Sequence, residues 1–442
     1  MKIKLIGLFV CLSLLGLINV SYGQDLLIKN GTILTVTQGI IQNGDILIVD
    51  GIIKEIGEDI QAPEGIRIVD ASDKFIIPGI IDSHTHIALS GTNEGTNAIS
   101  SEVDMRDVLN ADDTGILTAL SGGVTMIHTM HGSANPIAGE NITLKMKWGK
   151  TSEELIVHEA DRTLKFALGE NPKRSRASGT NTAPRYPQTR MGVNAIIRRE
   201  FLKAKNYMQQ WDRYEKLKAM KKPPKNLIPP RKNLRLEPLV AMLRGEIVAR
   251  CHAYQADEMI EFINLSKEFG FKIACFEHAW EGYKIAKEIV ANNIGISVFA
   301  DSWAYKVEAA EGIAYNAGFC ANQGVLVSIN SDSGERIRRL FNDAAKTMKY
   351  GGLSENEALR LITINPAIQL GVDDIVGSLE VGKQGDIAIF HEHPLSIYTR
   401  CEMTIVEGDI YFDRAQYLKE REEMEKKEKE TKTAKKKKGG AR

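Results

Sequence analysis

Short apolar runs alternate with helix-like segments through the middle of the chain, and this alternation limits the folds available to it. Several runs precede amphipathic stretches such as QADEMIEFINLSKEFG, and repeated strand-then-helix units build parallel sheets. Eight units in about 300 residues predict an α/β fold with a (β/α)8, TIM-like barrel. An open doubly wound sheet is the alternative, but no glycine-rich dinucleotide loop supports it. The eight strand-like runs are FIIPGIIDSHTH, GGVTMIHTMHG, NITLKMKWG, RTLKFALGE, EIVARCHAY, KIACFEHAW, IGISVFAD and VLVSINSDSG.

Both ends of the chain carry further β-patterned runs, punctuated by glycine and aspartate. LLIKNGTILTV and GDILIVDGIIKEIG precede the barrel units, and GSLEVGKQGDIAIFHEHP and EMTIVEGDIYF follow them. We expect the two ends to pair into a small discontinuous β-sandwich domain made of residues 24–74 and 373–415. The barrel then occupies residues 75–372.

One segment within the barrel region does not fit a strand-then-helix unit. Residues 171–237 contain 18 Lys and Arg against 4 Asp and Glu, and they include a long helical pattern. Active sites of such barrels lie on the face that carries the loops after the strands. We therefore expect this basic helical insertion to overhang the site as a lid. Residues 416–442 are expected to form a charged tail that begins as a helix.

The first residues have the pattern of a secretory signal. A short basic start, MKIK, precedes the apolar stretch LIGLFVCLSLLGLI, and SYG offers small residues for cleavage. A membrane anchor is the alternative, but polar residues and glycine dilute the run, which is short for a span. We expect residues 1–23 to be a signal peptide, and the protein to be exported to a periplasmic or extracellular location.

Charge and cysteine content narrow the classes of partner and of structure. The formal net charge is zero, so the whole molecule is not steered toward nucleic acid, although its basic segments could contact an anionic surface. Barrels of this kind often form homo-oligomers. No cysteine after the signal lies in a CxxC pair, and we predict buried free thiols at Cys251, Cys275, Cys320 and Cys401.

The stretch IIPGIIDSHTH ends in two histidines one residue apart. Alternate side chains of a strand share a face, so Asp82, His84 and His86 point the same way. At the C-terminal mouth of a barrel, two such imidazoles make half of a metal site. The same spacing recurs at His391 and His393, which lie in the region of the small β domain and are interpreted as surface or turn residues.

Other strand-like runs end in residues of the same chemistry. His252 ends the fifth run, His278 the sixth and Asp332 the eighth, while Lys165 lies in the fourth. A barrel would bring these residues together at one mouth. Four histidines and one carboxylate suit Zn²⁺, Fe²⁺ or Mn²⁺.

These motifs resemble the metal-dependent amidohydrolase superfamily, and within it the imidazolonepropionase-like and prolidase-like branch. The resemblance covers most of the chain and is carried by PGIIDSHTH, GGVTMIHTM, His252, EHAWEGYKIA, SINSDS and LITINPAIQLGVDDIVGSLEVGKQGDIAIF. It implies two divalent metals, with Zn²⁺ first and Fe²⁺ or Mn²⁺ as alternatives. The implied ligands are His84, His86, Lys165, His252, His278 and Asp332.

The resemblance also implies roles for these ligands. His84 and His86 hold one metal together with Asp332, His252 and His278 hold the second, and carboxylated Lys165 bridges the two. An ordinary lysine reaching from the strand end is the alternative, with Glu170 and Glu140 as rival bridging carboxylates. If none of the three bridges, the site holds one metal, as in the imidazolonepropionases and deaminases of the superfamily.

The implied reaction is hydrolysis of a C–N amide bond in a peptide, dipeptide or cyclic amide that bears a carboxylate. Metal lowers the pKa of bound water toward ~7, and the resulting hydroxide attacks the carbonyl while Asp332 acts as general acid and base. A helix N-cap is the structural alternative for Asp332. The competing functions are a mononuclear imidazolonepropionase-like hydrolase or deaminase, and a non-catalytic binding protein on the same scaffold.

Three further residues are candidates for binding a small-molecule or peptide substrate. His128 and His131 follow the second strand, where they could orient a substrate, or could equally be satisfied by the backbone. Arg174 follows the fourth strand in GENPKR and could bind a carboxylate, as could Lys173. A solvated loop charge is the alternative for both cations.

Overall fold

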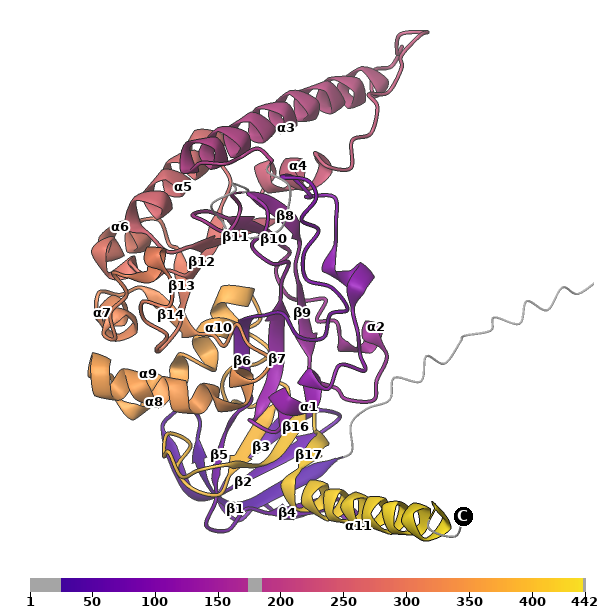
Figure 1. Ribbon diagram of the computed structural model, residues 1–442, viewed down its shortest axis with the longest axis vertical. Helices are drawn as coiled ribbons and strands as arrows, with labels where there is room; N and C mark the ends of the chain where they lie inside the picture. Colours follow the sequence, from indigo (N-terminus) through magenta and orange to yellow (C-terminus); the bar gives the residue numbers. More distant parts are fainter. Residues whose placement is uncertain (1–24, 174–184, 440–442) are drawn as a thin grey trace, which may run out of the picture.

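The chain forms three β-sheets with helices packed against them (Figure 1). The computed structural model describes residues 25–173 and 185–439. The predicted signal peptide and Arg174 lie outside the described residues. One sheet has eight strands, one has six and one has three. The two smaller sheets come from the middle of the chain and carry the residues of the predicted metal site.

The eight-stranded sheet takes its strands from both ends of the chain. Its order is β17-β16-β15-β5-β1-β2-β3, and β4 pairs with β1. Asp50 and Gly51 connect β2 to β3, Glu407 and Gly408 connect β16 to β17, and all four have positive φ, as tight hairpin turns require. The strands are β1 (Leu26–Leu34), β2 (Ile40–Val49), β3 (Ile52–Gly57), β4 (Arg67–Asp70), β5 (Phe75–Pro78), β15 (Ile387–Phe390), β16 (Cys401–Val406) and β17 (Asp409–Asp413).

The six-stranded sheet has the order β14-β13-β12-β11-β10-β8. Strands β10 to β14 are parallel to their neighbours, and β8 pairs antiparallel with β10. All four residues of β13 are buried, as expected for a parallel strand covered on both faces. The strands are β8 (Ile137–Glu140), β10 (Thr163–Ala167), β11 (Val248–Ala253), β12 (Ile273–His278), β13 (Gly295–Val298) and β14 (Leu326–Ile329).

The three-stranded sheet corrects one part of the barrel prediction. It contains β6 (Ile80–Thr85), β7 (Val124–Thr129) and β9 (Ile142–Lys145), in that order. Strand β6 is parallel to β7, but β9, which lies within the predicted third barrel strand, pairs antiparallel with β7. The predicted run of eight parallel units is therefore wrong at its third member. Only Asn141 separates β8 from β9, and both strands run antiparallel to their partners. The chain therefore reverses direction between β7 and β8, in residues 130–136, a segment too short for a helical crossover.

Hydrogen bonds from side chains and loops link the two smaller sheets. Ser83 Oγ of β6 lies 2.9 Å from Ser297 Oγ and 3.0 Å from Ser328 Oγ. On the other side, the Asn141 N–H donates to the Thr163 carbonyl at 3.0 Å. Within the described residues, no strand of the six-stranded sheet pairs with a strand of the three-stranded sheet. The two sheets are nevertheless neighbours at two places. Strand β6 lies beside β14, and Asn141, between β8 and β9, lies beside β10.

Helices cover the outer side of the six-stranded sheet (Figure 1). The predicted helix after β11 is α5 (Ala256–Phe269), which ends at Gly270 with φ 85°, where only glycine adopts a left-handed C-cap without cost. Apart from α3, the other described α-helices between β6 and β15 are α1 (Gly115–Leu120), α2 (Ser152–Leu155), α4 (Glu237–Leu243), α6 (Ala286–Ala291), α7 (Asn316–Asn322), α8 (Leu340–Gly351), α9 (Glu355–Arg360) and α10 (Ile364–Leu370).

The long helix of the basic insertion packs on the outside and does not form an overhanging lid. Helix α3 (Arg190–Lys218) lies beside α5, and its Phe201 is fully buried (Figure 1). The Phe201 ring stacks 4.5 Å from Phe271 and 6.2 Å from Phe166 of β10, measured between centroids. The lid interpretation is therefore corrected for this helix, because its apolar face supplies part of the outer layer after β10.

Replacing Phe201 by alanine is expected to lower the free energy of unfolding by about 3–5 kcal/mol, because a large cavity would open in the aromatic cluster. Leu202 is the matched control, since it follows on the same helix and is 51% exposed. Urea unfolding of both variants measures the difference. Equal and small losses would contradict the packing of α3 against the sheet.

The C-terminal tail begins as a helix, as predicted. Helix α11 (Arg414–Gly439) follows β17 directly, and residues 415–430 are exposed along its length. None of the described helices has both the length and the apolar character needed to cross a bilayer. The four cysteines predicted to be buried free thiols are all buried and unpaired.

Candidate metal centre

Strand β6 delivers the two histidines of the HxH motif to one end of the parallel strands. His84 is fully buried, whereas His86 lies just beyond the strand and its side chain is 26% exposed. His86 Nε2 lies 3.2 Å from Asp332 Oδ1, and His84 Nε2 lies 3.9 Å from the same oxygen. The predicted half-site thus faces the carboxylate that follows β14.

Three neighbouring strands bring Lys165, His252 and His278 to the same region. Lys165 of β10 and His252 of β11 point inward. Phe166, the next residue of β10 after Lys165, points the opposite way, toward the outer aromatic cluster, because alternate side chains of a strand face opposite sides. His278 ends β12 at φ 71°. This left-handed backbone turns its ring back toward the site, although its neighbour Glu277 occupies the inward position of the strand.

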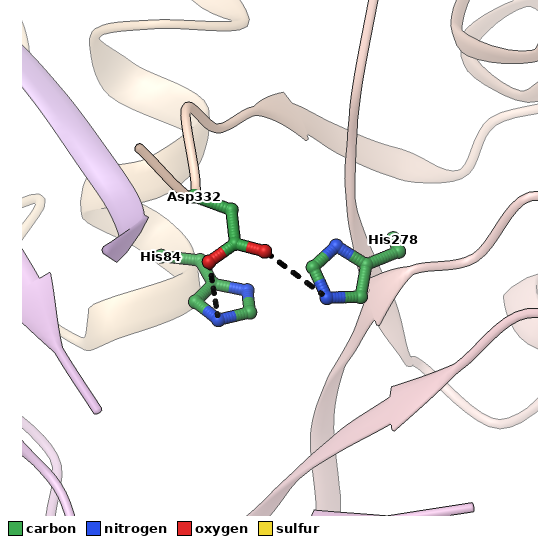
Figure 2. A group of neighbouring side chains, drawn as sticks. All are labelled: His84, His278 and Asp332. Atoms are coloured by element: carbon green, nitrogen blue, oxygen red, sulfur yellow. Dashed lines mark ion pairs between the residues drawn. The ribbon is translucent and has the colours of Figure 1, made fainter. Parts of the chain in front are cut away.

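Figure 2 shows His84, His278 and Asp332 facing one another. One ligand atom from each residue can be chosen so that all three lie within 4.8 Å. His278 Nε2 lies 3.9 Å from Asp332 Oδ2. The His278 ring centroid is 4.8 Å from that of His84 and 4.7 Å from that of His252. His84, His278 and Asp332 therefore converge, and His252 lies next to His278.

The donor atoms fit a cation. Within the described structure, neither ring nitrogen of buried His252 has a hydrogen-bond partner, and Nδ1 of His278 has none either. Leaving buried polar atoms without a partner costs free energy. His86 Nδ1 lies 2.7 Å from the Met130 carbonyl oxygen and donates to it. With the proton on Nδ1, the lone pair of His86 Nε2 faces the Asp332 carboxylate. A proton or a cation between the two atoms would remove the repulsion. Imidazole nitrogens and a carboxylate oxygen are ligands that Zn²⁺, Fe²⁺ and Mn²⁺ accept.

The electrostatics keep these groups in their metal-binding protonation states. Burial, followed by the nearby Lys165 charge, lowers the pKa of His84 to about 4. Burial also holds the pKa values of His252 and His278 well below the ordinary histidine value. Burial would raise the pKa of Asp332, but the neighbouring histidines, His84 first, outweigh it and lower that pKa. His84, His252 and His278 are therefore neutral, and Asp332 is ionised, at neutral pH.

Lys165 is fully buried and lies against the histidines. Its Nζ is 3.3 Å from His84 Nε2. Burial lowers the pKa of this amine, although Glu277 and Asp332 oppose the shift. A lowered pKa increases the fraction of neutral amine, which is the nucleophilic form of lysine.

The structure gives His128 and His131 internal partners, which corrects their interpretation as substrate-binding residues. The two ring nitrogens of His128 each lie 2.9 Å from a threonine hydroxyl, of Thr143 and of Thr163. His131 Nδ1 donates to the Gly132 carbonyl at 2.7 Å, and its Nε2 accepts from the Glu94 N–H at 2.9 Å. Both rings are buried, so no ring nitrogen is left for a substrate.

We expect His128 to make the fold sensitive to acid. Burial, then repulsion from Arg250, lowers its pKa well below the ordinary value of 6.5. The unfolded chain binds a proton near pH 6.5 and the folded chain does not, so this stability is present above pH 6.5 and is lost as the pH falls below it. Between pH 7 and 5.5, wild type should lose about 1 kcal/mol more unfolding free energy than His128→Gln. Urea titrations of the metal-free proteins at both pH values measure this, and equal losses would contradict it.

The remaining predicted residues lie elsewhere. Glu140 pairs with Arg162 at 2.9 Å, and the Glu170 N–H donates to Glu308. Within the described residues neither rival carboxylate forms an ion pair with a histidine of the site. His391 and His393 lie 3.5 and 3.6 Å from Glu392 and Glu355 respectively. These two histidines are half-buried and separate from the metal cluster, in line with their interpretation as surface or turn residues.

Sequence reasoning missed Glu277 and Arg250 and left Asp82 without a role. Glu277 and Arg250 are both fully buried, and Glu277 Oε1 accepts from Arg250 Nε at 2.7 Å. Asp82 accepts from the Ser331 hydroxyl at 2.5 Å and from the His84 N–H at 3.2 Å, bracing β6 against the loop after β14. Strand alternation could have revealed Arg250, because it lies two residues before His252 and shares the inward face of β11 with it.

The fold and the site together define an α/β protein with a cluster of histidines and an aspartate, able to hold a cation, at the C-terminal ends of parallel strands. A family profile described as Amidohydrolase family matches residues 286–427. The solved amidohydrolase of Thermotoga maritima MSB8 is 32% identical, covers 88% of this chain and 100% of its own, and superposes with a TM-score of 0.79. The chain belongs to the amidohydrolase family, whose members are hydrolases acting on C–N bonds.

More distant relatives share the fold or parts of the sequence. A solved prolidase complexed with N-methylphosphonate-L-proline has the same fold, with 14% identity, coverage of 88% of this chain and 100% of its own, and a TM-score of 0.55. Amidohydrolase tasK of Hapsidospora irregularis is 29% identical over 398 residues, which are 84% of this chain and 40% of tasK. Dihydropyrimidinase of Dictyostelium discoideum is 38% identical over 153 residues, 34% of this chain and 27% of its own. The chain spans less than half of these two curated relatives.

Proposed function

We propose that this chain is a divalent-metal-dependent hydrolase that cleaves a C–N amide bond in a small peptide or cyclic amide. The single observation that carries the proposal is the convergence of His84, His278 and Asp332 within 4.8 Å. A binding protein on this scaffold has no need for that set of neutral imidazoles around an ionised carboxylate. The non-catalytic alternative is therefore less favoured.

We infer that two metals bind, with Zn²⁺ first and Fe²⁺ or Mn²⁺ as alternatives. When bound, a divalent metal supplies a Lewis acid that polarises the substrate carbonyl and lowers the pKa of a water. The ligands in this proposal are His84, His86, Lys165, His252, His278 and Asp332. Asp332 also takes the proton from the attacking water and delivers it to the leaving nitrogen, because its carboxylate is ionised and is reached by three histidines.

The proposal for Lys165 is that it reacts with CO₂. Its neutral amine forms a C–N bond to the carbon of CO₂ and loses one proton, which leaves a carbamate with two oxygens. Each oxygen could bind one metal. The support is its buried Nζ beside His84 Nε2 and the lowered pKa of the amine. If Lys165 is not carboxylated, the site is mononuclear, and an imidazolonepropionase-like hydrolase or a deaminase becomes the second candidate.

The substrate class in this proposal is an amide that bears a carboxylate. Support comes from two relatives named above, the prolidase complexed with N-methylphosphonate-L-proline and the dihydropyrimidinase. A dipeptide or a cyclic amide therefore fits the proposed function. We propose no nucleic-acid partner. Self-association and contact of the basic segments with an anionic surface are further proposals, checked by light scattering and by salt-sensitive binding to an anionic polymer.

Three structural expectations belong to the same proposal. We infer that the six- and three-stranded sheets are two parts of one distorted barrel, linked through Ser83. Residues 24–74 and 373–415 are proposed as a small sandwich-like β domain beside it. Residues 1–23 are proposed as a signal peptide, so the mature chain would start near Gln24 and be found outside the cytoplasm, which N-terminal sequencing of the secreted form checks.

The experiment that tests the function is metal analysis of the chain purified without chelators, followed by a hydrolysis screen. The screen contains dipeptides, cyclic amides, imidazolones and an aminopurine for deamination. Two metals per chain with amide hydrolysis support the proposal. One metal with imidazolone hydrolysis or deamination favours the second candidate. No metal and no turnover would contradict both enzymatic candidates.

A further inference from the structure

A buried carboxylate lies behind the first metal-site histidine. Glu277 Oε2 is 3.2 Å from His84 Nδ1, on the opposite side of the ring from the Nε2 atom that faces Asp332 and Lys165. Both side chains are at most 1% exposed. The two atoms lie at ion-pair distance, and neither has a hydrogen-bond partner in the described structure.

Arg250 fixes this carboxylate from the other side. Its Nε donates to Glu277 Oε1 at 2.7 Å, and its two terminal nitrogens donate to the carbonyls of Gln369 and Ser83, both at 3.2 Å. Because every contact of the guanidinium goes to a different element, its position is determined by the barrel interior. The Ser83 carbonyl belongs to the residue before His84. Arg250 therefore balances the buried charge of Glu277 and joins β11 to β6 and α10, a structural role that a lysine cation can partly fill.

We propose that Glu277, held by Arg250, is the positioning residue for His84. Its Oε2 accepts the Nδ1–H of His84, which leaves the lone pair on Nε2 and aims that atom at the metal site. A metal-bound histidine commonly donates its second N–H to a carboxylate, and loss of such a partner typically weakens metal affinity 10–100-fold. This inference rests on the proposed function, because it requires His84 to bind metal.

A purely structural ion pair is the competing explanation. Arg250 and Glu277 are buried together, and removing either partner from a buried pair leaves an uncompensated charge that destabilises a fold. Stability alone therefore cannot separate the two roles. Metal affinity can, because the positioning role requires the carboxylate to reach His84, whereas the structural role requires only that the charges balance.

The test measures Zn²⁺ dissociation constants by chelator competition on full-length wild type, Glu277→Gln, Glu277→Asp and Arg250→Lys, together with urea midpoints of the metal-free proteins. Glu277→Asp keeps the negative charge beside Arg250 but shortens its reach toward His84. We expect Glu277→Gln and Glu277→Asp to weaken Zn²⁺ binding 10–100-fold. Arg250→Lys should lower the urea midpoint while the dissociation constant changes less than about threefold. The absorption spectrum of bound Co²⁺ should shift in the two Glu277 variants.

The outcomes separate this inference from the proposed function. If wild type binds no Zn²⁺, both fail. If wild type binds Zn²⁺ and Glu277→Asp binds it equally well, only the positioning role is overturned. The same conclusion follows if affinity falls in parallel with stability in all three variants, including Arg250→Lys. If Glu277→Gln does not fold, Glu277→Asp and Arg250→Lys alone still decide the question.

Discussion

Replacing Asp332 by asparagine is expected to lower kcat/KM about 10³–10⁴-fold while the fold is retained. General acid–base catalysis contributes about 10²–10⁴-fold, and this carboxylate also faces the ligands His84, His86 and His278 at 3.2–3.9 Å. Asparagine has nearly the same shape but cannot accept a proton at neutral pH. The measurement is steady-state hydrolysis of the best substrate from the screen, with circular dichroism as the check on folding.

Asp374 provides the matched control. It is an exposed aspartate in the loop after α10, so Asp374→Asn makes the same chemical change away from the metal cluster and should leave kcat/KM within about twofold, as surface substitutions usually have small effects. An Asp332→Asn enzyme that is as active as wild type would refute the proton-transfer role of Asp332. A loss of metal with retained fold would assign its importance to ligand binding.

Replacing Lys165 by alanine is expected to reduce bound metal from two per chain to one or none, and to lower kcat/KM by more than about 10³-fold. The reason is that alanine removes the only proposed bridging ligand, and each metal would lose one oxygen donor. Electrostatic stabilisation of the developing negative charge then weakens, which is commonly the largest contribution to catalysis. Metal analysis by mass spectrometry and the hydrolysis assay measure the two effects.

Lys145 is the control for loss of a buried lysine. Its Nζ donates to Asp386 at 2.6 Å, and it is 2% exposed. Lys145 therefore pairs with a buried carboxylate and is not among the proposed metal ligands. Lys145→Ala should be destabilised but should bind the same number of metals as wild type. Unchanged metal content in Lys165→Ala would contradict the bridging role and favour a site without this lysine.

The sequence alone determined the parts of the site that depend on local alternation. Lys165 and His252 face inward because each occupies the inward register of a buried strand, and His84 is reached in the same way. Apolar periodicity likewise predicted α5, which ends before Gly270, where the positive φ favours glycine. These features need only the geometry of one strand or one helix, so a single sequence contains enough information to predict them.

Only the tertiary structure decided the features that depend on which segments meet. His278 reaches the site through a left-handed backbone, and Asp332 has φ 43°, which strand periodicity does not predict. The hydrogen-bond partners of the His128 and His131 ring nitrogens could be identified only from the folded structure. The packing of Phe201 against Phe271 turned an expected lid into part of the outer layer. In each case the deciding energy is a contact between residues far apart in sequence, and such contacts leave no periodic pattern in either segment alone.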